Sequence, residues 1–161
     1  PRKARVSSAA SQHLYVPESA QVARTLVGEL RDAHRSLMAQ LSAMDALTAG
    51  DPADPVLCAN GRWRLSQASL GRRLLAARIC DYFLPRLDAC ERQALKQLIA
   101  ADQALLKDSS AHLGRWTAER VRDDWAGFRT ASSEMRRKTF EHIAREQRLL
   151  YPMLQEAAAR R

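Results

Sequence analysis

Residues 139–154 read TFEHIAREQRLLYPML, and this stretch decides both the fold and the first candidate site. On a helix, residues three or four positions apart lie on one face, so His142 and Glu146 point the same way. Both belong to a pattern of alternating three- and four-residue spacings, which is typical of a helix that buries one stripe. The pattern comprises Trp125, Phe128, Ser132, Met135, Thr139, His142, Glu146, Leu149 and Met153. An imidazole and a carboxylate are therefore expected among buried residues.

A buried imidazole and carboxylate need partners, because unpaired ionisable groups are costly in a protein interior. A bound cation is one such partner. In the alternative interpretation the helix is slightly rotated, and a different set of residues forms the buried stripe. That set comprises Phe140, Ile143, Leu150 and Leu154. Candidate residues on the other expected helices are needed to distinguish the two interpretations.

The whole chain has the composition of a helical domain. It has 161 residues, of which 46% are hydrophobic and 27% charged, with only 6 Gly and 6 Pro. A chain of this length can bury a core, and its many Ala, Leu, Arg and Gln residues favour helices. We expect an all-α fold with a disordered basic arm at residues 1–17, a bundle at residues 18–157 and a frayed tail at residues 158–161.

The net charge of +8 raises the question of nucleic-acid binding. The Arg residues are spread along the chain, whereas a specific nucleic-acid interface would gather them on one face. Cys58, Cys80 and Cys90 lack the spacing of a metal motif and predict reduced thiols. No apolar run approaches the ~20 residues that span a bilayer, and none has the form of the apolar region of a signal peptide. We therefore expect a cytoplasmic protein with no membrane partner and no specific nucleic-acid partner.

Three helices are expected before the one that contains His142. The first opens near Pro17 and stops before Gly50, with His34 in the middle of its apolar stripe. The third starts near Ala101 and carries His112 on its stripe. Taken alone, a histidine on such a stripe is more often a hydrogen-bonded core residue than a ligand. Short connections between helices of similar length predict an antiparallel up-down four-helix bundle.

The second helix is expected to open near Trp63 and to kink or end at Pro85. Beyond the proline, Leu87 and Glu91 share one face, with Asp88 beside them. Glu91 has an alternative role as an exposed acid that pairs with a neighbouring basic residue. The stripe assigned to this helix comprises Leu70, Leu74, Ala77, Asp81 and Leu84.

Each expected helix thus carries a candidate metal ligand: His34, Glu91, His112, and His142 with Glu146. This order resembles the hemerythrin-like (HHE cation-binding) family. That family has one His on the first helix, His-x-x-x-Glu on the second, one His on the third and His-x-x-x-Glu on the fourth. The resemblance covers roughly residues 26–156, and the segments that carry it are LRDAHRSL, DYFLPRLDACER, SSAHLGRW and FEHIAREQRLLYPML.

The resemblance implies a site for two non-haem irons bridged by carboxylates and held by imidazoles. One departure concerns Leu87, which stands where the family has its second-helix histidine and which cannot ligate a metal. Asp88 is a candidate substitute, although its side chain points about 100° away around an ideal helix. We therefore expect an incomplete di-iron site with at most about one tightly bound ion. Imidazole and carboxylate ligands suit iron, manganese or zinc, and the resemblance implies iron, with manganese or zinc as alternatives.

Two glutamates and three histidines buried together without a cation would consume most of a typical stability of ~5–15 kcal/mol. Either a cation is bound, or Arg side chains enter the site, or the groups do not all converge. We expect a bacterial-type hemerythrin-like protein that binds metal, and with it dioxygen, in oxygen, iron or redox sensing or storage. It is not expected to be an enzyme, because no phosphate loop or nucleophile elbow is present. The alternative, which Leu87 favours, is a metal-poor bundle that acts as a protein-interaction or regulatory module.

Overall fold

The computed structural model describes residues 16–52 and 54–159. Within them the chain is helical and has no strand, which confirms the all-α prediction. The expected arm and tail lie mostly outside the described residues, although residues 16–17 and 158–159 belong to helices. The elements are α1 (Val16–Thr48), α2 (Pro55–Phe83), the short 3-10 helix η1 (Leu84–Arg86), α3 (Ala89–Arg115), α4 (Ala118–Asp123) and α5 (Trp125–Ala159).

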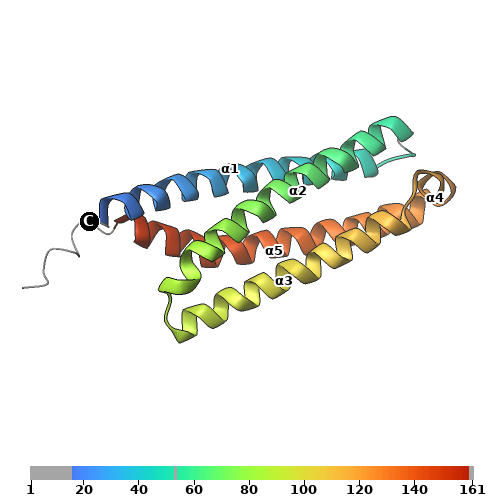
Figure 1. Ribbon diagram of the computed structural model, residues 1–161. Helices are drawn as coiled ribbons and strands as arrows, with labels where there is room; N and C mark the ends of the chain where they lie inside the picture. The colour runs from blue at the N-terminus through green and yellow to red at the C-terminus, as the bar shows by residue number, and fades with distance from the viewer. Residues whose placement is uncertain (1–15, 53, 160–161) are drawn as a thin grey trace, which may run out of the picture.

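The four long helices extend alongside one another, and α4 caps one end (Figure 1). α1 packs along both α2 and α5, and α3 packs along α5. Arg24 Nη1, near the start of α1, donates to the carbonyl oxygen of Ala158 at 3.1 Å. At the opposite end, Trp125 Nε1 donates to the carbonyl oxygen of Gly50 at 3.1 Å. The start of α1 therefore meets the end of α5, and the end of α1 meets the start of α5.

Capping chemistry sets the start of α2. The carboxylate of Asp54 accepts from the backbone N–H of Val56 at 2.7 Å and from that of Leu57 at 3.2 Å. Pro55 follows at the first helical position, where its missing N–H costs no hydrogen bond. The helix thus begins at Pro55, about two turns before the expected start near Trp63.

The corner between α2 and α3 differs from the sequence-based prediction. Pro85 lies in η1, directly after the end of α2. Asp88 then opens α3 with a capping box: its side chain accepts from the backbone N–H of Glu91, and the Glu91 side chain accepts from the backbone N–H of Asp88. Residues 89–95 therefore belong to α3. Their assignment to the second helix, with a third helix starting near residue 101, is wrong.

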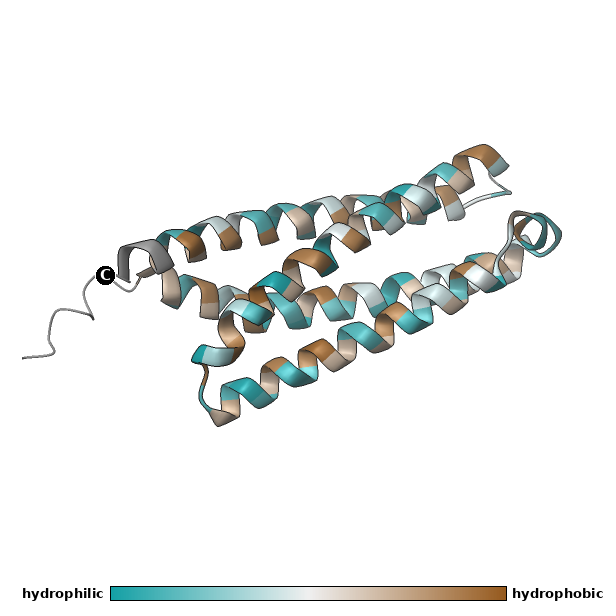
Figure 2. Ribbon diagram, viewed as in Figure 1, coloured by the Kyte–Doolittle hydropathy of each residue, from teal (hydrophilic) through white to brown (hydrophobic). Residues whose placement is uncertain are grey.

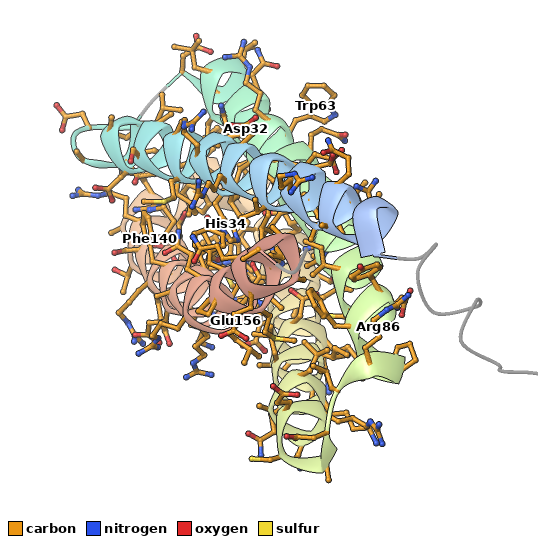
Figure 3. The ribbon with its side chains drawn as sticks, turned by 90° about the vertical axis from the view of Figure 1, so that its left-hand side faces the viewer. Asp32, His34, Trp63, Arg86, Phe140 and Glu156 are labelled. Carbon is orange, nitrogen blue, oxygen red and sulfur yellow. The ribbon has the colours of Figure 1, made fainter. Side chains whose placement is uncertain are left out.

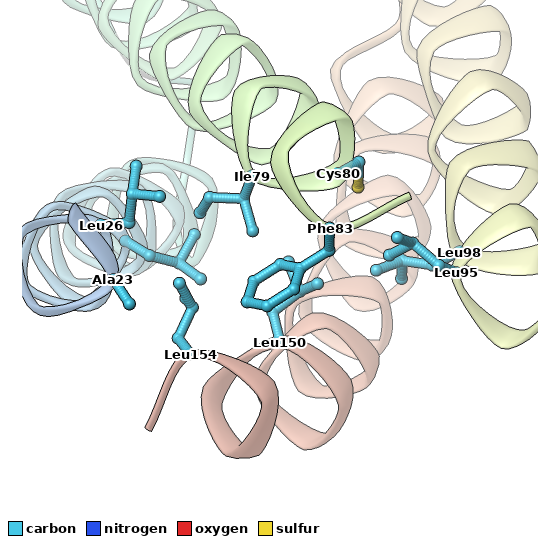
Figure 4. Packing of buried hydrophobic residues seen from close by; sticks show 10 residues of the cluster. Ala23, Leu26, Ile79, Cys80, Phe83, Leu95, Leu98, Leu150 and Leu154 are labelled. Carbon is cyan, nitrogen blue, oxygen red and sulfur yellow. The ribbon is translucent and has the colours of Figure 1, made fainter. Parts of the chain in front are cut away.

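The apolar core forms clusters along the length of the helices. Figure 4 shows the larger one, to which all four long helices contribute. A second cluster surrounds Phe128 and Trp116 at the opposite end, and a small one lies between the two. The small cluster consists of Leu37, Leu41 and Ile143. The larger one consists of Ala23, Leu26, Leu30, Ile79, Cys80, Phe83, Leu95, Leu98, Leu150 and Leu154.

Most of the α2 stripe that the sequence analysis assigned to the core is exposed. Leu70 is 43% exposed and Leu74 65%, and of this stripe Leu84, in η1, packs partly against the larger cluster. The buried face of α2 lies on the other side and includes Ala76, Ile79 and Phe83. Both faces of this helix carry apolar residues, so spacing alone gave the wrong stripe.

Hydrophilic residues recur along every long helix (Figure 2). No helix in the described part of the chain combines the length and hydrophobicity needed to cross a membrane.

Candidate metal centre

A layer of buried polar side chains interrupts the apolar core between the larger cluster and the Leu37 cluster. Figure 3 shows His34 between α1 and α5, whereas Asp32 and Trp63 lie on the outside. His34, Arg72 and Glu146 are at most 2% exposed, and His142 is 4% exposed. Asp102 of α3 lies at the edge of the layer, and 24% of its side chain is exposed. We call these five residues the polar layer.

Glu146 stands at the centre of the polar layer. Its Oε2 accepts from His34 Nε2 at 2.9 Å, and its Oε1 accepts from Arg72 Nη1 at 2.6 Å. The other terminal nitrogen of Arg72, Nη2, donates to Asp102 Oδ1. A single guanidinium from α2 thus bridges carboxylates from α3 and α5, which is the fork geometry that arginine offers.

The ring of His34 is held at both nitrogens. Because Nε2 donates to the Glu146 carboxylate, Nδ1 accepts from the Tyr151 hydroxyl at 2.8 Å. Arg31 in turn lies over the Tyr151 ring, with its guanidinium 5.6 Å from the ring centre. Tyr151, which the sequence analysis did not single out, therefore fixes the orientation of His34 from the outer side of the layer.

His142 presents an unsatisfied nitrogen to the same two carboxylates. Its Nε2 lies 3.2 Å from Asp102 Oδ1 and 3.7 Å from Glu146 Oε1. It is buried and makes no aligned hydrogen bond to either. Asp102, His142 and Glu146 are the one group among the described residues whose ligand-type atoms, all within 4.8 Å of one another, could hold a metal ion.

The charges in the layer do not balance without a further cation. Burial opposes ionisation of Glu146, but His142, His34 and Arg72 together lower its pKa to about 2. The pKa of Asp102 is also lowered, against the effect of burial, by His142 and Arg72. Two ionised carboxylates therefore face one guanidinium near neutral pH. A proton on His142 or a bound metal ion would supply the missing positive charge.

The structure brings together three of the five predicted ligands: His34, His142 and Glu146. The prediction that Glu91 joins them is wrong, because Glu91 lies in the exposed first turn of α3, where it caps the helix. The prediction for His112 is also wrong. Its half-buried ring stacks on Phe128 in another part of the bundle, with ring centres 6.1 Å apart.

Two members of the polar layer, Arg72 and Asp102, were missed by the sequence analysis. Arg72 lies four residues before Ala76 on the stripe that continues to Ile79 and Phe83. Asp102 lies four residues after Leu98, which is buried on α3. In both cases the signal is a charged residue at a three- or four-residue spacing from buried apolar residues.

Leu87 packs against the larger apolar cluster between η1 and α3. We expect Leu87→His to leave the metal content unchanged, because Leu87 lies just before the start of α3, whereas Asp102 lies in the middle of that helix. Elemental analysis of the purified variant beside wild type checks this expectation. A rise towards two ions per chain would contradict the placement.

Asp88 acts as a helix cap, and its replacement tests that role. We expect Asp88→Ala to lower the free energy of unfolding by about 1 kcal/mol, the usual cost of losing an N-cap. Its metal content should equal that of wild type. Asp32→Ala is the matched control, because Asp32 pairs with Arg35 on the exposed face of α1. Urea denaturation should show the larger loss for Asp88→Ala, and equal losses would contradict the capping role.

Comparison of the chain with family models, curated proteins and solved structures finds no match. The resemblance to the hemerythrin-like family therefore stays a prediction.

Proposed function

We propose that the chain is an antiparallel up-down four-helix bundle that binds a non-haem transition-metal ion at Asp102, His142 and Glu146. The observation that carries this proposal is the buried Nε2 of His142, which has no aligned hydrogen bond and faces two carboxylate oxygens. A metal ion at about 2.0–2.2 Å from each ligand holds neighbouring ligand atoms roughly 3–3.6 Å apart. The distances of 3.2 and 3.7 Å in the polar layer are close to that range.

One ion fits this ligand set better than two. Glu91 and His112, which a second ion of the hemerythrin type would need, lie elsewhere. Two carboxylates and an imidazole suit iron, and also manganese or zinc. Arg72 and His34 would orient Glu146 without ligating the ion, as partners of a metal ligand commonly do.

The role we propose for the bound ion is oxygen, iron or redox sensing or storage in a non-catalytic, cytoplasmic, hemerythrin-like protein. Iron is the metal that the family resemblance favours, with dioxygen as the further ligand. Support for this role rests on the sequence motifs around His34 and His142. The metal-binding step itself rests on the polar layer and is tested separately.

A second function is favoured by Arg72. Its guanidinium already supplies positive charge to Glu146 Oε1 and Asp102 Oδ1, the oxygens that a metal would use. A metal-poor bundle that serves as a protein-interaction or regulatory module is the corresponding alternative. Exposed Trp63 and Leu74 on α2 are side chains of the kind that such a module uses for contact.

Metal titration distinguishes the two functions. Protein purified without a metal-affinity tag is stripped with a chelator and titrated with Mn(II), Zn(II) and, without air, Fe(II). We expect about one equivalent to bind wild type, and His142→Gln to abolish binding. His112→Gln is the matched control and should bind like wild type, since His112 lies outside the polar layer. Absence of binding to wild type would favour the metal-poor alternative.

The pH dependence of stability gives a further prediction for the metal-free protein. Burial opposes the charged form of His142, but Asp102 and Glu146 raise its pKa above the ordinary value, with Arg72 acting against them. The protonated imidazole therefore stabilises the fold fully below about pH 6.5, and this contribution is lost as pH rises through the raised pKa. We expect the free energy of unfolding of wild type to fall as pH rises above about 6.5, and that of His142→Gln to fall less. Urea denaturation at several pH values measures this loss. If the free energy of unfolding falls equally with pH in wild type and His142→Gln, the placement of His142 is wrong.

A further inference from the structure

A cavity lies between α1, α2, α3 and α5, on the Phe128 side of the Leu37 cluster. Its volume is about 60 Å³, room for on the order of four water molecules. Its lining combines apolar side chains, among them Leu41, Leu65 and Phe128, with the polar side chains of Arg62 and Arg136. The cavity shares no lining residue with the polar layer. Among the described residues, no carboxylate lines it.

Arg62 is the unusual member of this lining, because its charge has no counter-ion among the described residues. Its Nη2 makes one long hydrogen bond, of 3.5 Å, to the carbonyl oxygen of Leu113, and its guanidinium lies 5.7 Å from the centre of the Phe128 ring. Its Nε is buried and has no partner. Arg72, by contrast, holds two carboxylates. A partly buried guanidinium without an anion lowers the stability of the fold. The cavity therefore lacks an anion that would balance the charge of Arg62.

The remaining polar groups bring no anion into the cavity to balance Arg62. Arg136 is 6% exposed, and its Nη1 donates to Ser132 while its Nη2 donates to Asp45, which satisfies it. Burial lowers the pKa of His112, and the charges of Arg62, Arg136 and Arg115 lower it further. An imidazole that resists protonation beside two guanidiniums indicates a site with surplus positive charge. Hydroxyl groups, among them those of Ser69 and Ser109, also line the cavity.

We propose that this cavity binds a short-chain monocarboxylate. The guanidinium of Arg62 pairs with the carboxylate group, in the two-pronged geometry that arginine favours. The hydrocarbon part of the ligand lies against Leu41, Leu65 and Phe128. An inorganic oxyanion fits less well, because it would lose water against these apolar side chains without compensation. The ligand site is separate from the metal centre and does not depend on it.

Butyrate is a suitable probe, with titration calorimetry and thermal unfolding as the measurements. We expect saturable binding to wild type and a matching rise in its melting temperature. Arg62→Gln should weaken butyrate binding roughly thirtyfold or more, because it removes the buried charge partner. Arg64→Gln is the matched control on the exposed side of the same helix and should bind like wild type. Circular dichroism verifies that both variants are folded.

A cavity-filling variant keeps the test decisive if Arg62→Gln does not fold. Ser69→Leu retains Arg62 but fills the space, and it should abolish butyrate binding. His142→Gln should bind butyrate normally, and Arg62→Gln should keep its metal content, so failure of one site is distinguishable from failure of the other. Undetectable binding of butyrate to wild type at millimolar concentration would overturn the proposal. Equal binding by Arg62→Gln, or preference for phosphate and sulfate over butyrate, would overturn it as well.

Discussion

Arg72→Met is expected to lower the free energy of unfolding by about 3–5 kcal/mol, the cost of breaking a buried ion pair by removing one partner. The guanidinium is 2% exposed and joins Glu146 to Asp102. Without it, two carboxylates face each other with no fixed positive charge between them. Methionine fills similar space, so the loss reports charge more than packing.

Urea denaturation measures this loss, and Arg78→Met is the matched control. Arg78 lies on the same helix but pairs with Glu29 at the surface, where an ion pair contributes about 0–1 kcal/mol. Adding Mn(II) or Zn(II) should restore more stability to Arg72→Met than to wild type, because the ion can neutralise the oxygens that Arg72 leaves behind. A variant as stable as Arg78→Met would show that the carboxylates are not held by Arg72.

Glu146→Gln is expected to abolish metal binding and to destabilise the fold at neutral pH. The lowering of the Glu146 pKa from its ordinary 4.5 to about 2 corresponds to about 3 kcal/mol of stability. Because the pKa is lower in the folded protein, this contribution is present above about pH 4.5 and is lost as pH falls towards 2.

The difference between wild type and Glu146→Gln should therefore shrink on acidification, which urea denaturation across this pH range measures. Glu141→Gln is the matched control, since Glu141 pairs with Arg137 on the exposed side of α5. It should bind metal like wild type and lose little stability. A constant difference between wild type and Glu146→Gln at all pH values would contradict the role of the ionised carboxylate.

The sequence predicted α1 and α5 well because the apolar residues of each gather on one broad face. His34 and the pair of His142 and Glu146 fall on those faces, and the structure places all three in the polar layer. The rotated alternative for α5 was also partly right, since Ile143, Leu150 and Leu154 are buried with His142 and Glu146. The two interpretations describe neighbouring parts of one wide buried face, so spacing alone could not separate them.

The middle of the chain was predicted poorly for two physical reasons. α2 has apolar residues on both faces, and only tertiary packing decides that Ile79 is buried and Leu74 exposed. The family pattern also placed Glu91 on the second helix, although the Asp88–Glu91 capping box is a start signal in the sequence. Moving the start of α3 to Ala89 places Glu91 in an exposed turn.

Arg72 and Asp102 were missed because arginine and aspartate on a helix are usually solvated. Their partners lie on other helices, so their role can be recognised only when the packing of the helices is known. The sequence analysis did include arginine entry as one way to neutralise a buried carboxylate, and this is how Arg72 contacts Glu146. Which arginine would enter depends on the register between α2 and α5, and no local pattern encodes that.

The polar layer also has a consequence for how the helices align during folding. Apolar side chains of similar size can replace one another in a core with little loss of stability. An all-apolar interface therefore distinguishes poorly between packings that are shifted along the helix. Moving α2 by one turn, about 5.4 Å, would carry Arg72 away from Glu146 and Asp102 and press its charge against hydrocarbon. Such a shifted packing is strongly disfavoured. The five residues of the polar layer thus favour one longitudinal position for each long helix.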